Sequence, residues 1–342
     1  MKRYNQTTTR PVAEISAVLL LTIIAFGGCS GPGSPEESTA GSHEGHAHDD
    51  PGADFRFEGE APIRAVCTTG QVADIVRVVG GDRVVVEAMM GPGVDPHLYR
   101  PTAADPDRIL DADIAFFSGL HLEGRMVEIL RNTAKQKRVF AVTDRLLKRD
   151  DPRLRKRPEF DGLHDPHVWH NAALWADCVR DVGDVLAEFD PDGADGYRDR
   201  AAAYAAEMDA LYEECEKAVA EIPEERRMMV TAHDAFSYFG EAYGIEVFGL
   251  KGISSEDEKD LAWQEEVQQM LIERKIPAVF VESAIAPRAV ESLVEPCREA
   301  GHDVKIPEEV LYADTLGPED SSADSYPGMI RHNLRVIVEA LK

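Results

Sequence analysis

Two series of short apolar runs, separated by one long amphipathic segment, constrain most strongly how this chain can fold. The first series lies at 63–69, 84–90, 114–119 and 138–143, and the second at 227–233, 247–252, 278–284 and 304–311. Helix-like stretches lie between consecutive runs, and this alternation is typical of parallel strands joined by crossover helices. The sequence therefore predicts an α/β protein with two (β/α) lobes built on parallel sheets.

The segment between the two series predicts one long helix. Its apolar residues recur at steps of three and four from Tyr197 to Ile222, which is the spacing of a helix with one buried face. A helix from Pro191 to Ile222 would be about 45 Å long, and Pro223 would end it. Because a continuous helix resists bending, we expect this rigid backbone helix to hold the lobes near one relative angle, with a largely preformed cleft between them.

The N-terminus predicts export. Basic residues precede the apolar run 15–26, which is too short to span a bilayer comfortably and is typical of a signal peptide. Two glycines and Cys29 follow and resemble the bacterial lipoprotein signal, in which Cys29 becomes the lipidated first residue of the mature chain. Ordinary signal cleavage without a lipid is the alternative. We expect residues 1–28 to be removed and Cys29 to anchor the chain at the periplasmic or extracytoplasmic face of the membrane.

Residues 29–61 predict a flexible tether, because they are rich in Gly, Pro, Ser and acidic residues and poor in large apolar ones. His43, His46 and His48 lie in this tether among acidic residues. They are candidates for weak auxiliary metal binding, with a plain polar linker as the alternative. The rest of the chain divides into an N-terminal lobe, a linking helix and a C-terminal lobe, predicted at 62–190, 191–223 and 224–342.

Composition narrows the class of partner. The formal net charge of −26 argues against nucleic acid, because phosphate binding needs clustered Lys and Arg. Besides Cys29, the chain has four cysteines, and none of them forms a CxxC pair. This spacing argues against a zinc cluster bound by cysteines. Disulfides are compatible with export, but the sequence does not indicate a pair among Cys67, Cys178, Cys215 and Cys297.

Four residues of metal-binding type, His97, His167, His233 and Asp314, are spread over more than two hundred positions. Each lies in a loop after an apolar run or before a helix, where α/β folds place their ligands. Three imidazoles and one carboxylate suit a divalent first-row ion such as Zn²⁺ or Mn²⁺. Because imidazole must be neutral to bind a metal, affinity should fall below about pH 6.

The neighbouring histidines leave an alternative at the second position. His164 and His170 flank His167 in GLHDPHVWH, and either could be mistaken for the ligand. The DPHxW context favours His167. Asp95 and Asp165, which begin the two DPH triplets, are predicted to stabilise turns rather than to bind metal.

Four stretches are found in order along residues 62–342: GVDPHLYRPTAADPDRILDADIAFFSGLHLEGRM, DPHVWHN, TAHDAFSYFG, and LYADTLG followed by DSYPGMIRHN. They resemble the zinc- and manganese-specific solute-binding lipoproteins of bacterial ABC importers, the cluster A-I type. The resemblance implies one metal ion in the cleft, bound by His97 and His167 from the N-terminal lobe and by His233 and Asp314 from the C-terminal lobe. It also implies a monomer that delivers the ion to a membrane permease with its ATPase.

The third ligand position bears on the choice of metal. Family members with glutamate at this position look like manganese binders, whereas this chain has His233, as in members that bind zinc and sometimes also manganese. A nitrogen-rich site holds Zn²⁺ more tightly than Mn²⁺, which stands lowest in the Irving–Williams order. The binding chemistry therefore favours zinc, and the transported ion stays open between zinc and manganese.

Residues around the ligands are candidates for supporting roles. His121 and Glu123 are predicted to lie near the cleft, and Glu282, which follows an apolar run, is a candidate to orient a ligand histidine. An enzyme is the rival class, but HExxH and HxxEH are absent and four protein ligands would leave zinc no open position, so a zinc hydrolase is not predicted. A surface adhesin of the same fold is the other alternative.

Overall fold

The computed structural model describes residues 55–342, which belong to one compact unit. The predicted signal peptide, Cys29 and the tether histidines His43, His46 and His48 lie outside the described residues. Within the described part of the chain, no helix is both long enough and apolar enough to cross a membrane.

A four-stranded parallel sheet forms the first half of this unit. Its strands are β1 (Ile63–Cys67), β2 (Val84–Ala88), β3 (Ile114–Phe117) and β4 (Arg138–Ala141), in the order β2-β1-β3-β4. Each strand lies within an apolar run that predicted it. The chain leaves β1 toward β2 on one side and returns to β3 on the other, which creates the kind of switch point at which open α/β sheets bind ligands.

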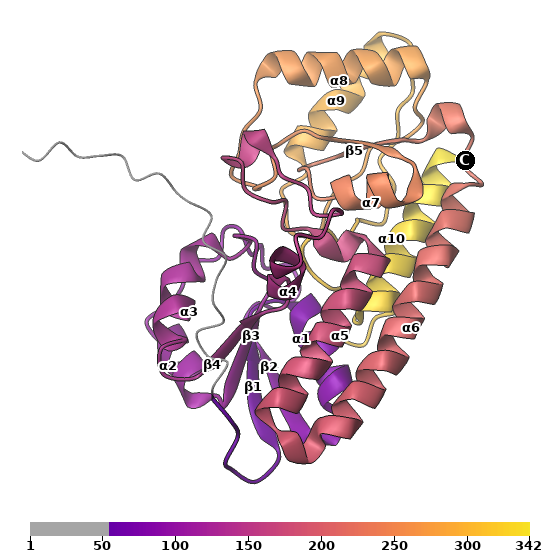
Figure 1. Cartoon of the computed structure of the whole chain (residues 1–342). Helices are drawn as coiled ribbons and strands as arrows, with labels where there is room; N and C mark the ends of the chain where they lie inside the picture. The colour runs from indigo at the N-terminus through magenta and orange to yellow at the C-terminus, as the bar shows by residue number, and fades with distance from the viewer. Residues whose placement is uncertain (1–54) are drawn as a thin grey trace, which may run out of the picture. The chain divides into compact units, whose positions relative to one another are not determined.

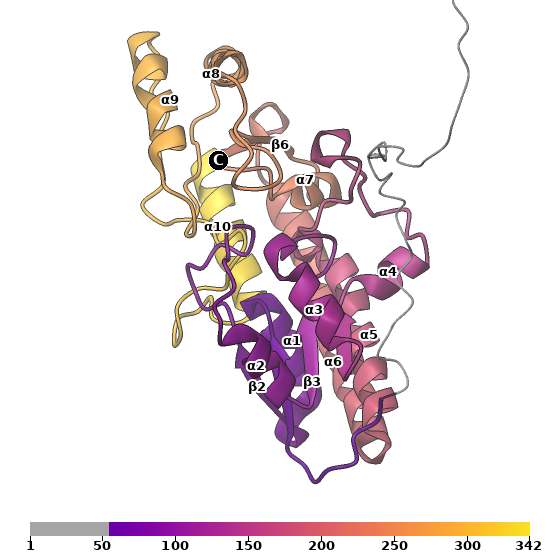
Figure 2. The ribbon, with the colours of Figure 1, turned by 90° about the vertical axis from the view of Figure 1, so that its left-hand side faces the viewer.

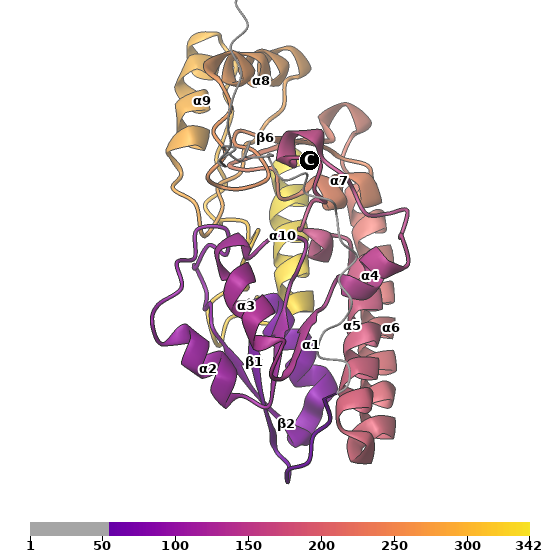
Figure 3. The ribbon, with the colours of Figure 1, turned by 60° about the vertical axis from the view of Figure 1, so that its left-hand side comes forward.

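Helices cover both faces of this sheet. On one face lies α1 (Gly70–Gly80) with α5 (Ala172–Phe189) and α6 (Ala194–Val219), and on the other lie α2 (Asp105–Asp111) and α3 (Val127–Thr133) (Figures 1 and 3). Successive strand residues enter two separate cores: Cys67 and Phe116 join one, and Val66 and Ala115 join the other. Burial on both faces explains why these strands read as continuous apolar runs rather than as alternating ones.

The second half of the unit contains a smaller sheet. Strands β5 (Met228–Thr231) and β6 (Glu246–Gly249) pair in parallel, with α7 (Ser237–Tyr243) between them in the sequence. The remaining helices are α4 (Asp144–Lys148), α8 (Leu261–Arg274), α9 (Arg288–Glu299) and α10 (Tyr326–Leu341). Figure 2 shows α8 and α9 at the end of this half that lies farthest from β2. Because both sheets belong to one compact unit, the predicted boundaries between the lobes stay predictions.

The last two apolar runs differ from the prediction, because 278–284 and 304–311 form isolated parallel bridges instead of regular strands. The bridges join Ala278 to Lys305 and Glu282 to Leu311, so three residues of one segment lie opposite five of the other between the bridges, and the register cannot continue. Pro307 lies in this interval and has no N–H to donate to a ladder. The Phe280 N–H still donates to the Val230 carbonyl at 2.9 Å, which keeps the first segment beside β5.

The long helix is confirmed, with shorter ends than predicted. The α-helix α6 spans Ala194–Val219 and is preceded by a 3₁₀ turn, Pro191–Gly193, so its regular part is about 39 Å long. After Val219, tight-turn bonds from Glu221 to Ala218 and from Ile222 to Val219 carry the chain to Pro223. The periodicity continued past the helix because the turn keeps Ile222 in the core.

Helix α6 is stiffened by its neighbours rather than acting as a lone rod. It packs along α5 and also contacts α1 and α10. A Cβ atom at Gly183 of α5 would lie 2.5 Å from the Cβ of Ala201, so glycine is what lets the two helices approach so closely. The Tyr204 hydroxyl donates to Asp74 of α1 at 2.5 Å, and Arg331 of α10 donates to Glu214 at 3.0 Å. Bending α6 would therefore disturb several packed interfaces at once.

The four cysteines of the described residues are free thiols. Cys67, Cys178, Cys215 and Cys297 are all buried, and each belongs to the main hydrophobic core. Burial raises the pKa of the Cys215 thiol to about 12 and raises the pKa of the Cys178 thiol well above its ordinary value. The open question of disulfide pairing is thus answered for these four positions.

Candidate metal centre

The structure brings together the four residues that the sequence singled out. One possible ligand atom from each of His97, His167, His233 and Asp314 lies within 4.8 Å of the other three. The Nε2 atoms of His97 and His167 are 3.2 Å apart. The nearest Asp314 oxygens lie 3.7 Å from Nε2 of His97, 3.5 Å from Nε2 of His167 and 3.2 Å from Nε2 of His233.

These four separations are similar to the spacing of ligand atoms around one tetrahedral ion. Ligand atoms about 2.0 Å from a zinc ion at tetrahedral angles lie about 3.3 Å from one another, which is close to the four distances above. Both carboxylate oxygens of Asp314 and the Nε2 atom of His233 are buried without a hydrogen-bond partner among the described residues. Buried polar atoms of this kind are normally satisfied, and a divalent cation at the centre would satisfy all three.

His97 is positioned by the loop after β2. The Asp95 Oδ1 atom accepts hydrogen bonds from the backbone N–H groups of His97 at 2.8 Å and Leu98 at 3.3 Å. This is the turn that the sequence predicted for the first DPH triplet. The turn directs the imidazole inward, so that His97 is 7 % exposed, while Leu98 remains exposed.

His167 is held more tightly, by the aspartate of its own DPH triplet. The Oδ1 atom of Asp165 accepts from the His167 backbone N–H at 3.0 Å and lies 2.8 Å from its Nδ1. A proton on Nδ1 that is shared with Asp165 leaves the Nε2 lone pair directed at the metal position. The turn role of Asp165 was predicted from the sequence, but its contact with the ring was missed. The DPH spacing, with a carboxylate two residues before the histidine, was the available signal.

His233 follows β5 directly and is oriented by Glu282, as the sequence proposed. The Glu282 carboxylate accepts from the His233 backbone N–H at 3.0 Å and lies 2.6 Å from its Nδ1. Each of these two histidines therefore has one buried carboxylate that binds both its backbone and its ring. Gly249 of β6 permits this placement, because a Cβ atom there would lie 2.7 Å from the His233 carbonyl carbon.

Asp314 is positioned through the preceding residue. The Ala313 carbonyl accepts from Trp169 Nε1 at 2.8 Å and lies 3.0 Å from His170 Nε2. His170 is thus a buried structural residue, and burial lowers its pKa to about 3, so that it stays neutral. Neither His170 nor His164, which forms an isolated bridge with Lys156, belongs to the four-residue cluster.

The two remaining candidates for support, Glu123 and His121, are not among the four clustered residues. Glu123 is buried and accepts from the Thr68 hydroxyl at 2.6 Å and the Ser118 N–H at 2.7 Å, so it stabilises the loops after β1 and β3. His121 has a backbone φ of +67° and an exposed side chain. The structure does not bring either residue into the cluster of metal-binding type.

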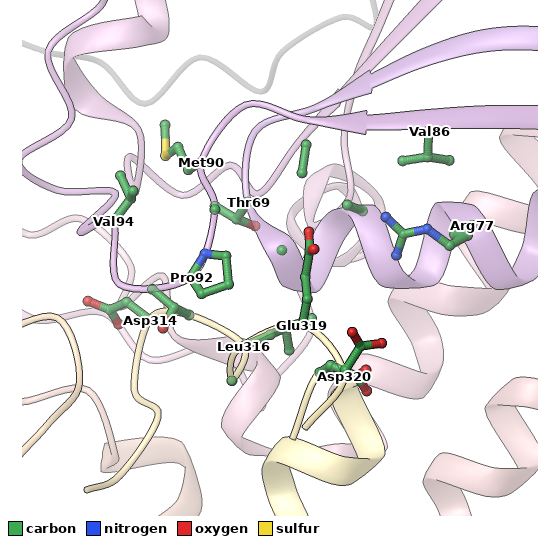
Figure 4. Close-up of a pocket in the computed structure, with 17 residues that line it drawn as sticks. Thr69, Arg77, Val86, Met90, Pro92, Val94, Asp314, Leu316, Glu319 and Asp320 are labelled. Atoms are coloured by element: carbon green, nitrogen blue, oxygen red, sulfur yellow. The ribbon is translucent and has the colours of Figure 1, made fainter. Parts of the chain in front are cut away.

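A cavity of about 510 Å³ adjoins the cluster and touches Asp314 but none of the three histidines. Asp314 lies at one end of this cavity beside Pro92 and Val94, and Glu319 and Asp320 line it farther along the same loop (Figure 4). Asp314 is therefore the candidate ligand that borders this cavity, whereas the imidazoles are enclosed by protein.

The charges of the cluster suit a cation. Burial opposes a charge on His233, but the Glu282 and Asp314 carboxylates outweigh this effect and hold the pKa of His233 well above its ordinary value. Burial also opposes a charge on Asp314, yet the imidazoles, above all His233, hold the pKa of Asp314 well below its usual range. For His97, burial dominates and lowers the pKa to about 3. Without metal, His233 and Asp314 are thus a charged pair, and His97 is neutral.

The raised pKa of His233 predicts that metal binding releases the proton of this residue. A metal ion must displace the proton of His233, whereas His97 is already neutral. Zn²⁺ affinity should therefore still rise with pH between pH 6 and 7.5, because the raised pKa of His233 keeps a proton on this ligand above pH 6, rather than fall only below pH 6. Chelator competition across this range, together with calorimetry in buffers of different ionisation enthalpy, measures both quantities. An affinity independent of pH in this range would contradict the charged state of His233.

Most of the chain is similar to known proteins. Residues 65–340 match the family described as "Zinc-uptake complex component A periplasmic". The manganese-binding lipoprotein MntA of Bacillus subtilis is 38% identical over 281 residues, covering 82% of this chain and 90% of the relative. The zinc-binding protein TroA of Treponema pallidum is 37% identical over 276 residues, covering 81% and 88%. A solved structure of the T. pallidum protein aligns with a TM-score of 0.77 at 36% identity, covering 83% of this chain and 99% of that one.

Proposed function

Because this chain belongs to the family of the periplasmic zinc-uptake complex component A, we propose that it captures a divalent transition-metal ion outside the cytoplasm and delivers it to an ABC permease. The ion is the transported substrate. His97, His167, His233 and Asp314 are its proposed ligands. The family is one of binding components for metal uptake, which makes this chain a solute-binding protein rather than an enzyme.

One observation carries the proposal: the buried Asp314 carboxylate has no hydrogen-bond partner among the described residues, yet it lies within 3.7 Å of three imidazole nitrogens. A buried carboxylate is costly unless a positive charge compensates it, and without metal only the proton of His233 does so. A bound dication supplies that compensation. The carboxylates of Asp165 and Glu282 then orient His167 and His233, whose nitrogen lone pairs bind the metal.

The donor set favours zinc over manganese. Three nitrogens and one oxygen form a borderline-soft set, and the Irving–Williams order places Mn²⁺ below Zn²⁺ at such a site. The relatives are described as manganese-binding in one case and zinc-binding in the other. We propose zinc as the tighter ligand and both ions as candidates for the transported substrate.

The partners of this function follow from the same proposal. Cys29 would carry a lipid that anchors the chain to the extracytoplasmic face of the membrane, and the permease with its ATPase would receive the ion from a monomeric binding protein. Four protein ligands leave zinc no open position for an attacking water, which weighs against a hydrolase. The adhesin alternative rests on family resemblance alone.

Metal analysis of the purified chain tests the proposed function. The protein is exposed to limiting, equimolar Zn²⁺ and Mn²⁺ and examined by native mass spectrometry and elemental analysis. We expect one tightly bound ion per chain, predominantly zinc. A chain that retained neither metal would contradict the proposal.

A deletion variant tests whether the tether contributes to the tight site. Deleting residues 30–58 removes His43, His46 and His48 but none of the four proposed ligands. The first ion should bind with nearly unchanged affinity, and only weak additional binding should disappear. Loss of the first ion in this chain would place the primary site in the tether.

A further inference from the structure

The two DPH triplets are identical in sequence, but their aspartates make different contacts. Asp165 uses one oxygen to bind both the backbone and the ring of His167. Asp95 uses Oδ1 for the backbone of His97, and its Oδ2 accepts a hydrogen bond from the Ser255 hydroxyl. Ser255 is 160 residues away in the sequence, and both partners are buried, at 4 % and 8 % exposure. The first triplet therefore forms a link to the second half of the molecule.

Ser255 belongs to a loop that begins beside His233. At the base of this loop, the Lys251 N–H donates to the Ala232 carbonyl at 3.0 Å, and the Gly252 carbonyl accepts from the Asp234 N–H at 3.0 Å. These bonds involve the residues immediately before and after His233. The loop therefore shares its attachment with one ligand-bearing segment, while its tip contacts the segment that carries His97.

Contacts inside the loop also hold it in one conformation between these two ends. The Lys251 ammonium group donates to the Ser255 carbonyl at 2.9 Å and to Glu258 at 2.6 Å. A backbone bridge between Lys251 and Glu258 closes the loop. These contacts fix the position of Ser255 beside Asp95. Moving Asp95 away therefore requires breaking its hydrogen bond with Ser255, because the loop cannot simply follow Asp95.

We propose that Ser255 is a positioning residue that slows release of the metal. Its hydrogen bond to Asp95 joins the loop of His97 to the loop attached beside His233, so the ligands of the two halves are linked even without the ion. This link rests on the function proposed above. An ion can leave when His97 moves away from His233 and Asp314, and that movement must first break the bond between Ser255 and Asp95.

A second contact of the same loop contributes less. Arg125 and Glu256 form an ion pair next to Ser255, but both side chains are exposed. Exposed ion pairs contribute little because water and salt screen them. A buried hydrogen bond to a carboxylate is stronger and more costly to break. The hydroxyl of Ser255, rather than the charge of Glu256, should therefore govern the rate of release.

The test is the rate at which the full chain loses Zn²⁺. Protein loaded with one equivalent of Zn²⁺ is mixed in a stopped-flow instrument with excess chromogenic zinc chelator. Ser255→Ala should release zinc about ten times faster or more than the wild type, as expected for loss of one buried charge-assisted hydrogen bond. The association rate should change much less, because the four ligands are intact. Ser255→Thr keeps a hydroxyl and should restore slow release.

Matched controls separate this role from general loosening of the loop. The adjacent Ser254 accepts a hydrogen bond from the Glu256 N–H inside the loop, and Ser254→Ala should release zinc at the wild-type rate. Glu256→Gln should accelerate release by no more than about threefold. In an Asp95→Asn background, the effect of Ser255→Ala should shrink, because the charged acceptor is replaced by a neutral amide that can form only a weaker hydrogen bond with Ser255. This background also tests the link if Ser255→Ala alone folds poorly.

The possible failures are distinguishable. A wild-type release rate in Ser255→Ala, or equal acceleration by Ser254→Ala, would overturn the role of Ser255 while leaving metal capture intact. An undiminished effect of Ser255→Ala in the Asp95→Asn background would overturn the proposed partner. A wild-type chain that bound no Zn²⁺ at all would instead contradict the proposed function.

Discussion

His97→Ala should lower the affinity for Zn²⁺ by about two to three orders of magnitude. Zinc sites built from four protein ligands have apparent binding free energies of roughly 10–16 kcal/mol, so one ligand carries on the order of 3–4 kcal/mol. His97 is the most informative of the three histidines to remove. Replacing His167 or His233 would also leave the buried carboxylate of Asp165 or Glu282 without its imidazole partner, and stability and binding would change together.

The matched control is His164→Ala. His164 lies three residues before His167 and was the sequence alternative for the same ligand position, but it is not part of the cluster. Competition against a chelator of known affinity should show nearly wild-type binding for this variant, and circular dichroism should show that both variants are folded. If His164→Ala lost affinity while His97→Ala did not, the proposed ligand set would be wrong.

His233→Glu should narrow the preference for zinc over manganese, but the structure adds a condition. An introduced carboxylate would lie beside Glu282, which is 2.6 Å from the His233 ring, and beside Asp314. Carboxylates this close cannot all be ionised without a large cost. The single variant should therefore lose affinity for both ions. A companion Glu282→Gln change removes one negative charge and supplies an amide that can donate a hydrogen bond.

The double variant His233→Glu/Glu282→Gln is thus the proper test of selectivity. Two nitrogens and two carboxylates form a harder ligand set, so zinc should lose more affinity than manganese. We expect the ratio of the two affinities to narrow by about one order of magnitude or more, the size of effect that changes around a metal ligand produce. Competition titrations with both ions measure the ratio, with Glu282→Gln alone as control. An unchanged ratio would exclude His233 from the ligands.

Much of the fold could be predicted because both faces of the parallel sheet are buried. Continuous apolar runs such as 63–69 and 114–119 are the direct result of that burial, and the spacing of three and four residues identified α6. The prediction failed at 304–311. The run has the right residues for a strand, but Pro307 and the unequal lengths of the paired segments prevent a continuous ladder. Sequence patterns do not report the partner segment's length.

The candidate ligands could be proposed because their loops contain distinctive short motifs, and the carboxylate of Glu282 because it follows an apolar run. The contacts of the two DPH aspartates could not be separated by the same reasoning. Asp95 and Asp165 have the same neighbours in sequence, and only Ser255, far along the chain, makes one of them a link between the two halves. His121 and Glu123 are not among the four clustered residues, and their supporting roles stay predictions.

The buried free thiols have a consequence for a member of a family that takes up thiophilic metal ions. A thiol binds Zn²⁺ or copper, or is oxidised, chiefly as an accessible thiolate. All four cysteines lie in the core, and burial raises the pKa of each thiol. The protein thereby keeps its own soft donors out of reach of its cargo. These four buried cysteines therefore offer the ion no accessible second site.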